Sequence, residues 1–459
     1  MTDGNLKNME NKKVLIVGFG ISGIAAAQAM VKLGAKVYIQ DSKKAETIDP
    51  NLITFFKEKG AICFFGSIPP DMSMFDMLIL SPGVNPELNF VKEAEEKGAE
   101  IIGELEIAYR IGCGNYVAIT GTNGKTTTTT LVGDMFKKQG RKTNVVGNIG
   151  VAVISASMDA GPDDWLVTET SSFQLETTKY FKPAISAILN ITPDHLNRHH
   201  TMKAYGEAKA KIFANQSQDG YLIINYDDKD CFKLAEGARA NVIPFSRKEE
   251  LKLGAFVKDG NMVIRNEEGQ LIEICPVKDL RILGDHNVEN ALAASAIAYF
   301  AGLDVEVIKK TLQDFPGVEH RLEFCNEIEG VRYFNDSKGT NTDAAITAIR
   351  AIKENIILIA GGDAKGQEFD ELVAEFPGRV KKMILLGRDA SFIKEAADKA
   401  GFADYIYGKD MDECVRLAYE IAESGDNVLL SPACASWDMY DNFEQRGKHF
   451  KNCVNRLEA

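Results

Sequence analysis

Residues 116–128 read Tyr-Val-Ala-Ile-Thr-Gly-Thr-Asn-Gly-Lys-Thr-Thr-Thr, and this stretch predicts the fold at the centre of the chain. The apolar run 117–119 is typical of a buried strand, and residues 125–138 can form a helix. A strand, a glycine turn and a helix N-terminus together cradle phosphate, because backbone N–H groups converge on the anion and the helix dipole favours its charge. The stretch therefore predicts a nucleotide-binding α/β domain.

The motif within it is Gly121-x-x-Gly124-Lys125-Thr126, a shortened phosphate loop with Ile119 where the longer pattern has glycine. Lys125 would reach the outer phosphates of a nucleotide, and the Thr126 hydroxyl would bind Mg²⁺. We interpret the motif as an ATP site rather than a chance glycine turn, because both the strand before it and the helix after it are predicted.

The composition is typical of a globular protein with two to four domains. Its 459 residues are 45% hydrophobic and 26% charged, and the net charge is −13. This negative charge argues against nucleic acid as a partner, so anionic substrates must meet local cations. The eight cysteines lie singly, without C-x-x-C pairs or metal-ligand spacing, which suits a reducing cytoplasm. Residues 1–13 are polar and the apolar runs are short, so we expect a cytoplasmic protein that does not bind membranes.

A second glycine turn lies near the start of the chain. Lys13–Val17 predicts a buried strand, Gly18-x-Gly20-x-x-Gly23 follows and opens a helix predicted to begin at residue 24, and Asp41 ends a second strand. This is the dinucleotide-binding pattern, in which the acid meets a ribose hydroxyl, although the same turn also holds other nucleotide phosphates. The loop 81–84 follows a further strand, at the strand ends where ligands of such sheets bind. We therefore predict a nucleotide or nucleotide-sugar domain, with plain helix–sheet packing as the alternative.

Polar groups also follow strands in the central part of the chain. Glu169 follows the predicted strand 165–168, where its carboxylate would hold Mg²⁺ beside the phosphate loop, directly or through water. Three of the six histidines lie within residues 195–200. They form either an exposed loop or a zinc site, and the zinc site is less well supported because no further ligand has suitable spacing.

Two lysines and two asparagines on predicted helices complete the central candidates. Lys209 and Lys211 lie on one helix, and either could be a cation for phosphate. Burial could instead lower the pKa of such a lysine, and its neutral amine could take up carbon dioxide to form a carbamate that binds Mg²⁺. Asn287 and Asn290 lie at the start of a later helix, where they could meet an adenine or cap the helix.

The last part of the chain again alternates strands and helices, which predicts another mostly parallel sheet. The predicted strands are Arg332–Asn335, Ile356–Ala360, Met383–Leu386 and Asn427–Leu430, and the predicted helices are Ala344–Lys353 and Ser391–Lys399. Polar clusters follow three of these strands, at residues 336–341, 361–365 and 431–436. Because the carboxyl ends of parallel strands meet at one edge, these loops are expected to converge on a ligand.

Together these motifs resemble those of the Mur ligases of bacterial cell-wall synthesis, from near Lys13 to near Arg446. The matching motifs are Gly121–Thr127, the Glu169 loop, Asn190–His195, His286-Asn287-x-x-Asn290, His320-Arg321 and Asn335–Lys338. The run 431–447, Ser-Pro-Ala-Cys-Ala-Ser-Trp-Asp-Met-Tyr-Asp-Asn-Phe-Glu-Gln-Arg-Gly, is similar to the members that add D-glutamate. The resemblance implies three α/β domains: a Rossmann-like UDP-binding domain (1–103), a central ATPase-type domain (104–317) and a Rossmann-like amino-acid-binding domain (318–459).

The resemblance implies an ATP-dependent ligase that joins D-glutamate to UDP-N-acetylmuramoyl-L-alanine through an acyl phosphate. These small molecules would be its partners, ATP and two Mg²⁺ ions its cofactors, and we expect a monomer. The implied catalytic residues are Lys125, His195 and a carbamylated Lys209, with His195 either a Mg²⁺ ligand or a proton carrier. The implied Mg²⁺ ligands are Thr126, Glu169, His195 and the carbamylated Lys209.

The resemblance also assigns the binding residues. The implied ATP ligands are Gly121, Thr122, Asn123, Gly124, Lys125, Thr126, Thr127, Asn287, Asn290, Arg321 and Asp336. The implied ligands of the UDP substrate are Gly20, Ile21, Ser22, Gly23, Asp41, Ser42, Lys43, Ser81 and Asn148. Many family members have arginine at the position of Lys43. The implied D-glutamate ligands are Lys338, Thr340, Lys365, Ser436 and Phe443.

Three other functions compete with this one. Folylpolyglutamate synthases share the ATP chemistry but lack a domain like residues 1–103. A nicotinamide-dependent oxidoreductase would explain Gly18–Gly23 and Asp41, but it leaves the 121–127 loop and Glu169 unexplained. A non-catalytic nucleotide-sensing module would not need the catalytic-type charges found in all three parts of the chain.

Overall fold

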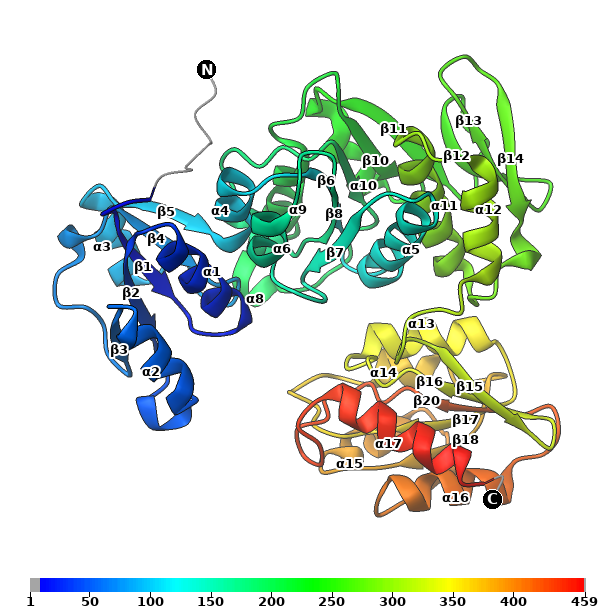
Figure 1. Ribbon diagram of the computed structural model, residues 1–459. Helices are drawn as coiled ribbons and strands as arrows, with labels where there is room; N and C mark the ends of the chain where they lie inside the picture. The colour runs from blue at the N-terminus through cyan, green and yellow to red at the C-terminus, as the bar shows by residue number, and fades with distance from the viewer. Residues whose placement is uncertain (1–8, 458–459) are drawn as a thin grey trace. The chain divides into compact units, whose positions relative to one another are not determined.

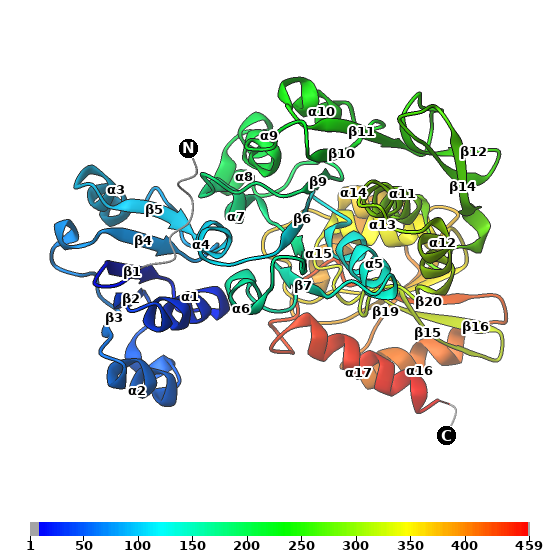
Figure 2. The same ribbon diagram turned by 45° about the horizontal axis from the view of Figure 1, so that its top comes forward.

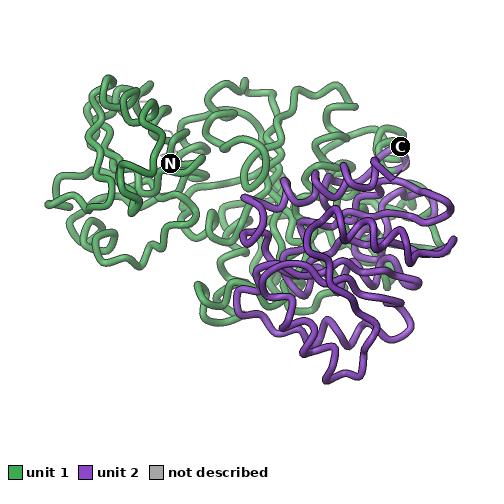
Figure 3. The backbone as a smooth tube through the Cα atoms, turned by 90° about the horizontal axis from the view of Figure 1, so that it is seen from below, with its two compact units in different colours: residues 1–277, 289–312 green, residues 278–288, 313–459 purple. Residues whose placement is uncertain are grey.

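The computed structural model describes residues 9–457 and contains three β-sheets flanked by helices (Figure 1). The chain divides into two compact units, which Figure 3 shows in separate colours. The first unit is residues 1–277 and 289–312, and the second is residues 278–288 and 313–459. The prediction of an α/β chain with three sheet-containing domains is confirmed.

The first sheet has the strand order β3-β2-β1-β4-β5, and its neighbouring strands are all parallel. The strands are β1 (Lys13–Val17), β2 (Lys36–Asp41), β3 (Ile62–Phe65), β4 (Met77–Leu80) and β5 (Glu100–Gly103). The helices are α1 (Ile21–Lys32), α2 (Pro50–Glu58) and α3 (Asn89–Glu96). The central strands β1 and β4 are apolar and buried, as parallel strands covered on both faces require. The predicted start of α1 at residue 24 is wrong, because the helix begins at Ile21 and includes Gly23 in its first turn.

The central sheet has the order β14-β13-β12-β11-β10-β9-β6-β8-β7. Its strands are β6 (Asn115–Thr120), β7 (Thr143–Gly147), β8 (Trp165–Glu169), β9 (Ile185–Ile188), β10 (Tyr221–Asn225), β11 (Asn241–Ser246), β12 (Gly254–Lys258), β13 (Asn261–Arg265) and β14 (Leu271–Pro276). Its helices are α4 (Glu104–Ile111), α5 (Lys125–Lys138), α6 (Val153–Asp159), α7 (Ser172–Glu176), α8 (Leu196–His199), α9 (Met202–Ala210), α10 (Lys229–Lys233), α11 (Asp285–Phe300) and α12 (Val305–Asp314). Strand β12 pairs in parallel with β11, and β13 and β14 extend the sheet by antiparallel pairing. These three strands were not predicted from the sequence.

The first and central domains share one hydrophobic core within the first unit. Helix α4 connects their sheets, and its Leu105 and Ile107 lie in the same buried cluster as Ala26 of α1 and Val153 of α6. Figures 1 and 2 show these three helices side by side. The buried carboxylate of Glu106 also accepts hydrogen bonds from the backbone N–H groups at 179–181. The first domain is therefore packed firmly against the central one.

The third sheet has the order β15-β16-β20-β17-β18-β19, with β15 antiparallel to β16 and the other pairs parallel. The strands are β15 (Glu323–Ile328), β16 (Val331–Asn335), β17 (Ile356–Ala360), β18 (Val380–Leu385), β19 (Tyr405–Tyr407) and β20 (Asn427–Leu430). The helices are α13 (Thr342–Ile352), α14 (Asp370–Ala374), α15 (Ala390–Lys399), α16 (Met411–Ile421) and α17 (Phe443–Asn455). Figure 2 shows α16 and α17 together on one face. Along β17, Leu358 packs with α13–α15, whereas Ile357 and Ile359 pack with α16 and α17, as the alternation of a strand requires.

Within residues 9–457, no helix combines the length and the apolar character needed to cross a membrane.

Candidate active site

The glycine turn of the central domain lies between β6 and α5, near the middle of the sheet. Gly124 precedes the helix with a φ of 82°, a conformation that favours glycine. A Cβ atom on Gly124 would lie 2.1 Å from Oδ1 of Asn290, so the missing side chain allows α11 to approach the turn. On another side, the Asn190 side chain accepts a hydrogen bond from the Asn123 N–H at 2.8 Å. The turn is thus held between two asparagines that the sequence places far from it.

Two lysine ammonium groups meet at one carbonyl of this turn. Lys125 Nζ donates to the backbone oxygens of Gly121 at 2.9 Å and Thr122 at 2.8 Å. Lys209 Nζ donates to the same Gly121 oxygen at 2.9 Å. Two lysine nitrogens from different helices thus converge on one backbone oxygen of the turn.

Lys209 is almost completely buried, at 1% exposure, and its ammonium lies 4.5 Å from the ring centre of Tyr205. Burial lowers the pKa of Lys209 well below its usual range, and the nearby charge of Lys125 lowers it further. Asp194 acts in the opposite direction but does not cancel these effects. Burial therefore favours the neutral amine of Lys209, which is the form that a carbamate would require.

Glu169 ends β8, between β6 and β7, and is 2% exposed. Its Oε1 accepts a hydrogen bond from Asn148 Nδ2 at 2.9 Å. Its Oε2 is buried and has no hydrogen-bond partner among the described residues. A buried carboxylate oxygen without a partner is costly, and Mg²⁺ prefers oxygen ligands of this kind. The unpartnered oxygen of Glu169 is therefore a candidate Mg²⁺ ligand.

His195 lies at the N-terminus of α8 with a φ of 53°, an unusual conformation for a residue other than glycine. Its Nε2 is 3.4 Å from Asp194 Oδ2, and its ring centre is 4.8 Å from that of Phe173. Partial burial lowers the pKa of His195, while Asp194 raises it and Lys209 and Lys125 lower it further. A neutral imidazole at this position can bind a metal ion or accept a proton.

The glycine turn of the first domain borders a cavity of about 630 Å³. The cavity is lined by Gly18, Asp41 and Ser42, among other residues. A Cβ on Gly23 would lie 1.9 Å from the Gly18 backbone oxygen, so this glycine lets α1 pack against the turn. Ile21, which is also predicted to bind the UDP substrate, begins α1 beside this turn, and its side chain is 77% exposed.

Asp41 closes this turn through its side chain. Its Oδ2 accepts a hydrogen bond from the Phe19 N–H at 2.6 Å, and its Oδ1 accepts one from the Lys43 N–H at 2.8 Å. Ser81 Oγ donates to the Gly18 oxygen at 2.8 Å. In this structure the carboxylate therefore orders the loop that faces the cavity.

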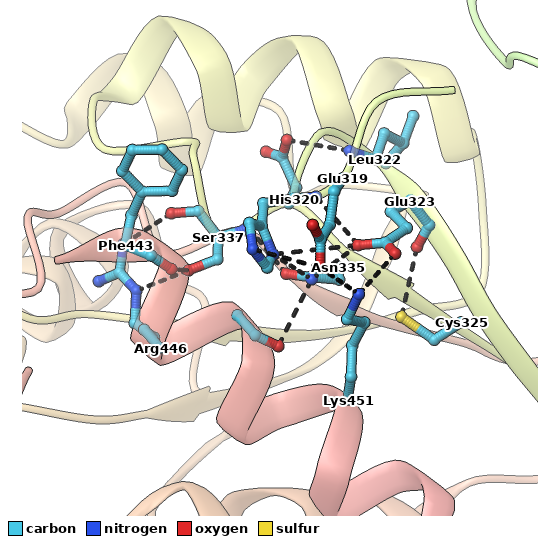
Figure 4. Close-up of polar contacts among 12 residues, drawn as sticks. Glu319, His320, Leu322, Glu323, Cys325, Asn335, Ser337, Phe443, Arg446 and Lys451 are labelled. Carbon is cyan, nitrogen blue, oxygen red and sulfur yellow. Dashed lines mark hydrogen bonds and ion pairs between the residues drawn. The ribbon is translucent and has the colours of Figure 1, made fainter. Parts of the chain in front are cut away.

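In the second unit, three loops lie at the carboxyl ends of the adjacent strands β16, β20 and β17, as predicted from the sequence. Arg446 of α17 links two of them and is 2% exposed. Its guanidinium donates to Ser337 Oγ at 3.0 Å and to the Ser337 oxygen at 2.8 Å (Figure 4). It also donates to the Cys434 oxygen at 3.1 Å. Ser337 Oγ in turn donates to the Phe443 oxygen at 2.8 Å. We did not predict this role, although Arg446 lies in the quoted run 431–447.

A second polar network holds the segment that leads into this sheet. Asn335 Nδ2 lies 2.9 Å from His320 Nδ1 and 3.0 Å from Glu323 Oε2 (Figure 4). Lys451 of α17 pairs with Glu323 at 2.9 Å and with Glu319 at 2.7 Å. The network fixes the backbone next to Arg321.

Arg321 and Asn287 line a cavity of about 210 Å³ in the second unit, together with Arg281, Phe324 and Phe334. Nearby, burial raises the pKa of Asp336 to about 6, although the Ser431 hydroxyl, which donates to it at 2.7 Å, lowers it. The apolar rings and cations suit a flat base joined to an anionic group.

The residues predicted to bind D-glutamate lie around the segment 436–443. Ser436 is 3% exposed, and Lys338 Nζ lies 5.3 Å from the ring centre of Phe443. Thr340 donates its N–H to the Lys338 oxygen at 2.9 Å. Lys365 Nζ lies 4.1 Å from a ring centre of Trp437. Two ammonium groups thus face two aromatic rings from one segment.

Comparison with known proteins gives matches along the whole chain. Three family descriptions match in order: Mur ligase MurD-like N-terminal domain (12–103), Mur ligase middle domain (119–298) and Mur ligase glutamate ligase domain (320–434). A UDP-N-acetylmuramoylalanine–D-glutamate ligase of Caldanaerobacter subterraneus subsp. tengcongensis is 49% identical over 452 residues, covering 98% of this chain and 99% of the relative. An enzyme of the same name from Thermoanaerobacter sp. is 50% identical with the same coverage.

Solved structures show the same fold at lower sequence identity. A pseudomurein peptide ligase type C from Methanothermus fervidus aligns with a TM-score of 0.59 at 19% identity, covering 97% of this chain and 100% of that chain. The UDP-N-acetylmuramate-alanine ligase of Thermotoga maritima aligns with a TM-score of 0.57 at 19% identity, covering 97% of this chain and 99% of that chain.

Proposed function

The chain belongs to the Mur ligase family, and from this premise we propose how it acts. It is an ATP-dependent ligase that adds D-glutamate to UDP-N-acetylmuramoyl-L-alanine in peptidoglycan precursor synthesis. Its substrates are small molecules, and we propose that it acts on them as a monomer in the cytoplasm. A nicotinamide-dependent oxidoreductase would account for the turn at Gly18–Gly23 alone.

The observation that carries the chemistry is the charge arrangement at the central turn. The ammonium of Lys125 and the side-chain nitrogen of Lys209 meet at Gly121, and Glu169 brings an unpartnered carboxylate oxygen to the end of the neighbouring strand. Such a site supports phosphoryl transfer, in which a protein mainly positions the groups and neutralises developing charge.

In the proposed reaction, a carboxylate oxygen of the UDP substrate attacks the γ-phosphorus of ATP, and the bond from that phosphorus to ADP breaks. Lys125 neutralises charge on the phosphoryl oxygens while the turn 121–127 holds the phosphates. The D-glutamate amine then attacks the acyl carbon, loses a proton and displaces phosphate. Because water would hydrolyse the acyl phosphate, the reaction needs a site that excludes it.

Mg²⁺ would be held by Thr126 and Glu169, and a second ion by His195 and a carbamylated Lys209. When bound, these ions supply positive charge that stabilises the transferring phosphoryl group. To form the carbamate, the neutral Lys209 nitrogen attacks carbon dioxide, an N–C bond forms and one proton leaves. The resulting carboxylate carries negative charge into a site that otherwise holds two lysines.

The other predicted binding residues divide among three sites, one for each substrate. The cavity at Asp41 and Ser42 would take the UDP portion, with the other first-domain residues and Asn148 along the rest of that substrate. Asn287, Asn290, Arg321 and Asp336 would bind the adenosine and phosphate portions of ATP. The segment 436–443 would bind D-glutamate together with Lys338, Thr340 and Lys365.

The test is phosphate release with ATP, Mg²⁺ and UDP-N-acetylmuramoyl-L-alanine, with D-glutamate, L-lysine or diaminopimelate as the amino acid. Release that depends on D-glutamate alone is expected. Release with L-lysine or diaminopimelate instead would keep the ligase but overturn the assignment of residues 431–447. Release with none of the amino acids would overturn the ligase itself.

A further inference from the structure

Trp437 is an exposed aromatic side chain on a segment that is otherwise well held. The residue is 65% exposed, whereas the preceding Ser436 is 3% exposed. The ammonium of Lys365 lies 4.1 Å from a ring centre of Trp437. At this distance a cation over an indole face is attracted by the negative face of the ring.

The backbone around Trp437 is tied down on both sides. Ala435 and Asp363 exchange two backbone hydrogen bonds of 2.9 Å, which join this segment to the loop after β17. On the other side, the Tyr440 N–H donates to the Ser436 oxygen at 2.8 Å, and the Asp438 side chain accepts a hydrogen bond from the Arg388 N–H at 2.9 Å. An exposed ring on such a fixed backbone is presented to solvent in a defined place, as a binding element requires.

The carboxylates near Lys365 are paired with another cation, so they compete little with the Trp437 ring for the Lys365 ammonium. The guanidinium of Arg388 pairs with Asp363 at 3.1 Å and with Asp389 at 3.3 Å, so these neighbouring carboxylates already have a cation. Lys365 also has a φ of 51°, and such strain in a residue other than glycine is concentrated at functional sites. The strained backbone and the ring together fix where the ammonium lies.

We propose that Trp437 is a positioning residue that holds Lys365 for the side-chain carboxylate of the incoming amino acid. The indole face attracts the ammonium and restricts the positions that the exposed, flexible lysine side chain can take, which reduces the entropy lost when it pairs with an anion. The pair thereby favours an acidic amino acid over its uncharged amide. This inference rests on the proposed function, since it assigns D-glutamate to the segment 436–443.

The first test compares Trp437→Leu and Trp437→Phe with the wild type in phosphate release. The Michaelis constant for D-glutamate is expected to rise about three- to tenfold in the leucine variant and about twofold in the phenylalanine variant, which keeps an aromatic face. The Michaelis constants for ATP and for the UDP substrate should stay unchanged. Phe392→Leu removes another exposed aromatic side chain, on α15 outside the segment 436–443, and should leave all three constants unchanged.

The same rise in all three Michaelis constants would show a general disturbance of the domain and would overturn the proposal. A double-variant cycle separates the two outcomes further. If Trp437 acts through Lys365, adding Trp437→Leu to Lys365→Met has no further effect on the constant for D-glutamate. Independent, multiplying effects would overturn the positioning role.

A binding measurement gives a readout apart from turnover. The sequence has two tryptophans, so Trp165→Phe leaves Trp437 as the sole indole. Titration of this variant, with the other substrates present, should give a saturable change in indole fluorescence with D-glutamate and a weaker one with D-glutamine. No change with D-glutamate would overturn the proposal. If wild-type phosphate release did not depend on D-glutamate, the proposed function would fail first, independently of Trp437.

Discussion

The chain contains two glycine turns of similar backbone design but opposite charge. Each follows a buried parallel strand and opens a helix, α1 in the first domain and α5 in the central domain. In the first, the carboxylate of Asp41 accepts the Phe19 N–H. In the second, the ammonium of Lys125 and the buried side-chain nitrogen of Lys209 meet at a carbonyl. A glycine turn before a helix therefore does not by itself specify chemistry, because the charges placed around the turn decide which groups it can favour.

The glycines of the two turns also serve different contacts. Gly23 is required by the turn's own backbone, since its Cβ would meet the Gly18 oxygen at 1.9 Å. Gly124 is required by a distant residue, since its Cβ would meet Asn290 Oδ1 at 2.1 Å. The first turn is therefore a local structure, whereas the second is assembled with α11.

The largest effect should come from Lys125→Ala in the central turn. Phosphate release should fall about 10²- to 10³-fold, because the transferring group loses a positioned cation, while circular dichroism stays that of the wild type. Lys137→Ala, an exposed lysine in the last turn of the same helix, is the matched control and should retain full activity. If Lys125→Ala turned over near the wild-type rate, the positive charge of Lys125 would not be what distinguishes the central turn from the first.

Lys209→Met should lower phosphate release about 100-fold, as expected for the loss of a metal ligand, yet raise the thermal midpoint by about 2–4 °C. The buried lysine has a lowered pKa, so the folded state binds fewer protons than the unfolded state between that pKa and the ordinary 10.5. The stability cost of the lysine therefore grows as the pH falls through this window.

The difference in thermal midpoint between Lys209→Met and the wild type should therefore become smaller as the pH approaches 10.5. Thermal melts at several pH values measure this, and intact mass after incubation with bicarbonate measures the carbamate in the wild type. A destabilised methionine variant would contradict the desolvation of Lys209, and an unmodified mass in bicarbonate would contradict the carbamate.

Gly23→Ala tests the local character of the first turn. The added Cβ should destabilise the first unit by about 3 kcal/mol, because the atom it meets is backbone and cannot move aside cheaply. Gly20→Ala is the matched control, since a Cβ there has no described heavy atom within 4 Å and should leave stability unchanged. Equal stabilities for the two variants, measured by urea unfolding, would show that α1 can shift away from the turn.

The smallest effect should come from Asp41→Asn. The Michaelis constant for the UDP substrate should rise about fivefold, since the loop loses one charge-assisted hydrogen bond, and that for ATP should not change. Asp49→Asn, at the N-cap of α2, keeps a good capping residue and serves as control. A rise in the constant for ATP would mean that the two turns are coupled.

Much of the fold could be predicted because its elements depend on neighbouring residues. The apolar runs of β17 and β20 and the helix α5 have the predicted bounds. The ribbon β12–β14 was missed, because mixed short strands form only by pairing with the sheet edge. The start of α1 was misplaced because Gly23 was assigned to the turn rather than to the helix.

The glycine turn before α5, the presence of three α/β domains and the family could all be predicted from the sequence, because each follows from short runs of residues. Only the tertiary structure decided which groups act on those loops. Lys209 reaches Gly121 across 88 positions, and Arg446 reaches Ser337 across 109. Burial, the pKa of Lys209 and the contact of Lys365 with Trp437 depend on such distant approaches. A local pattern cannot encode these properties, since desolvation and pairing are created only when the elements pack together.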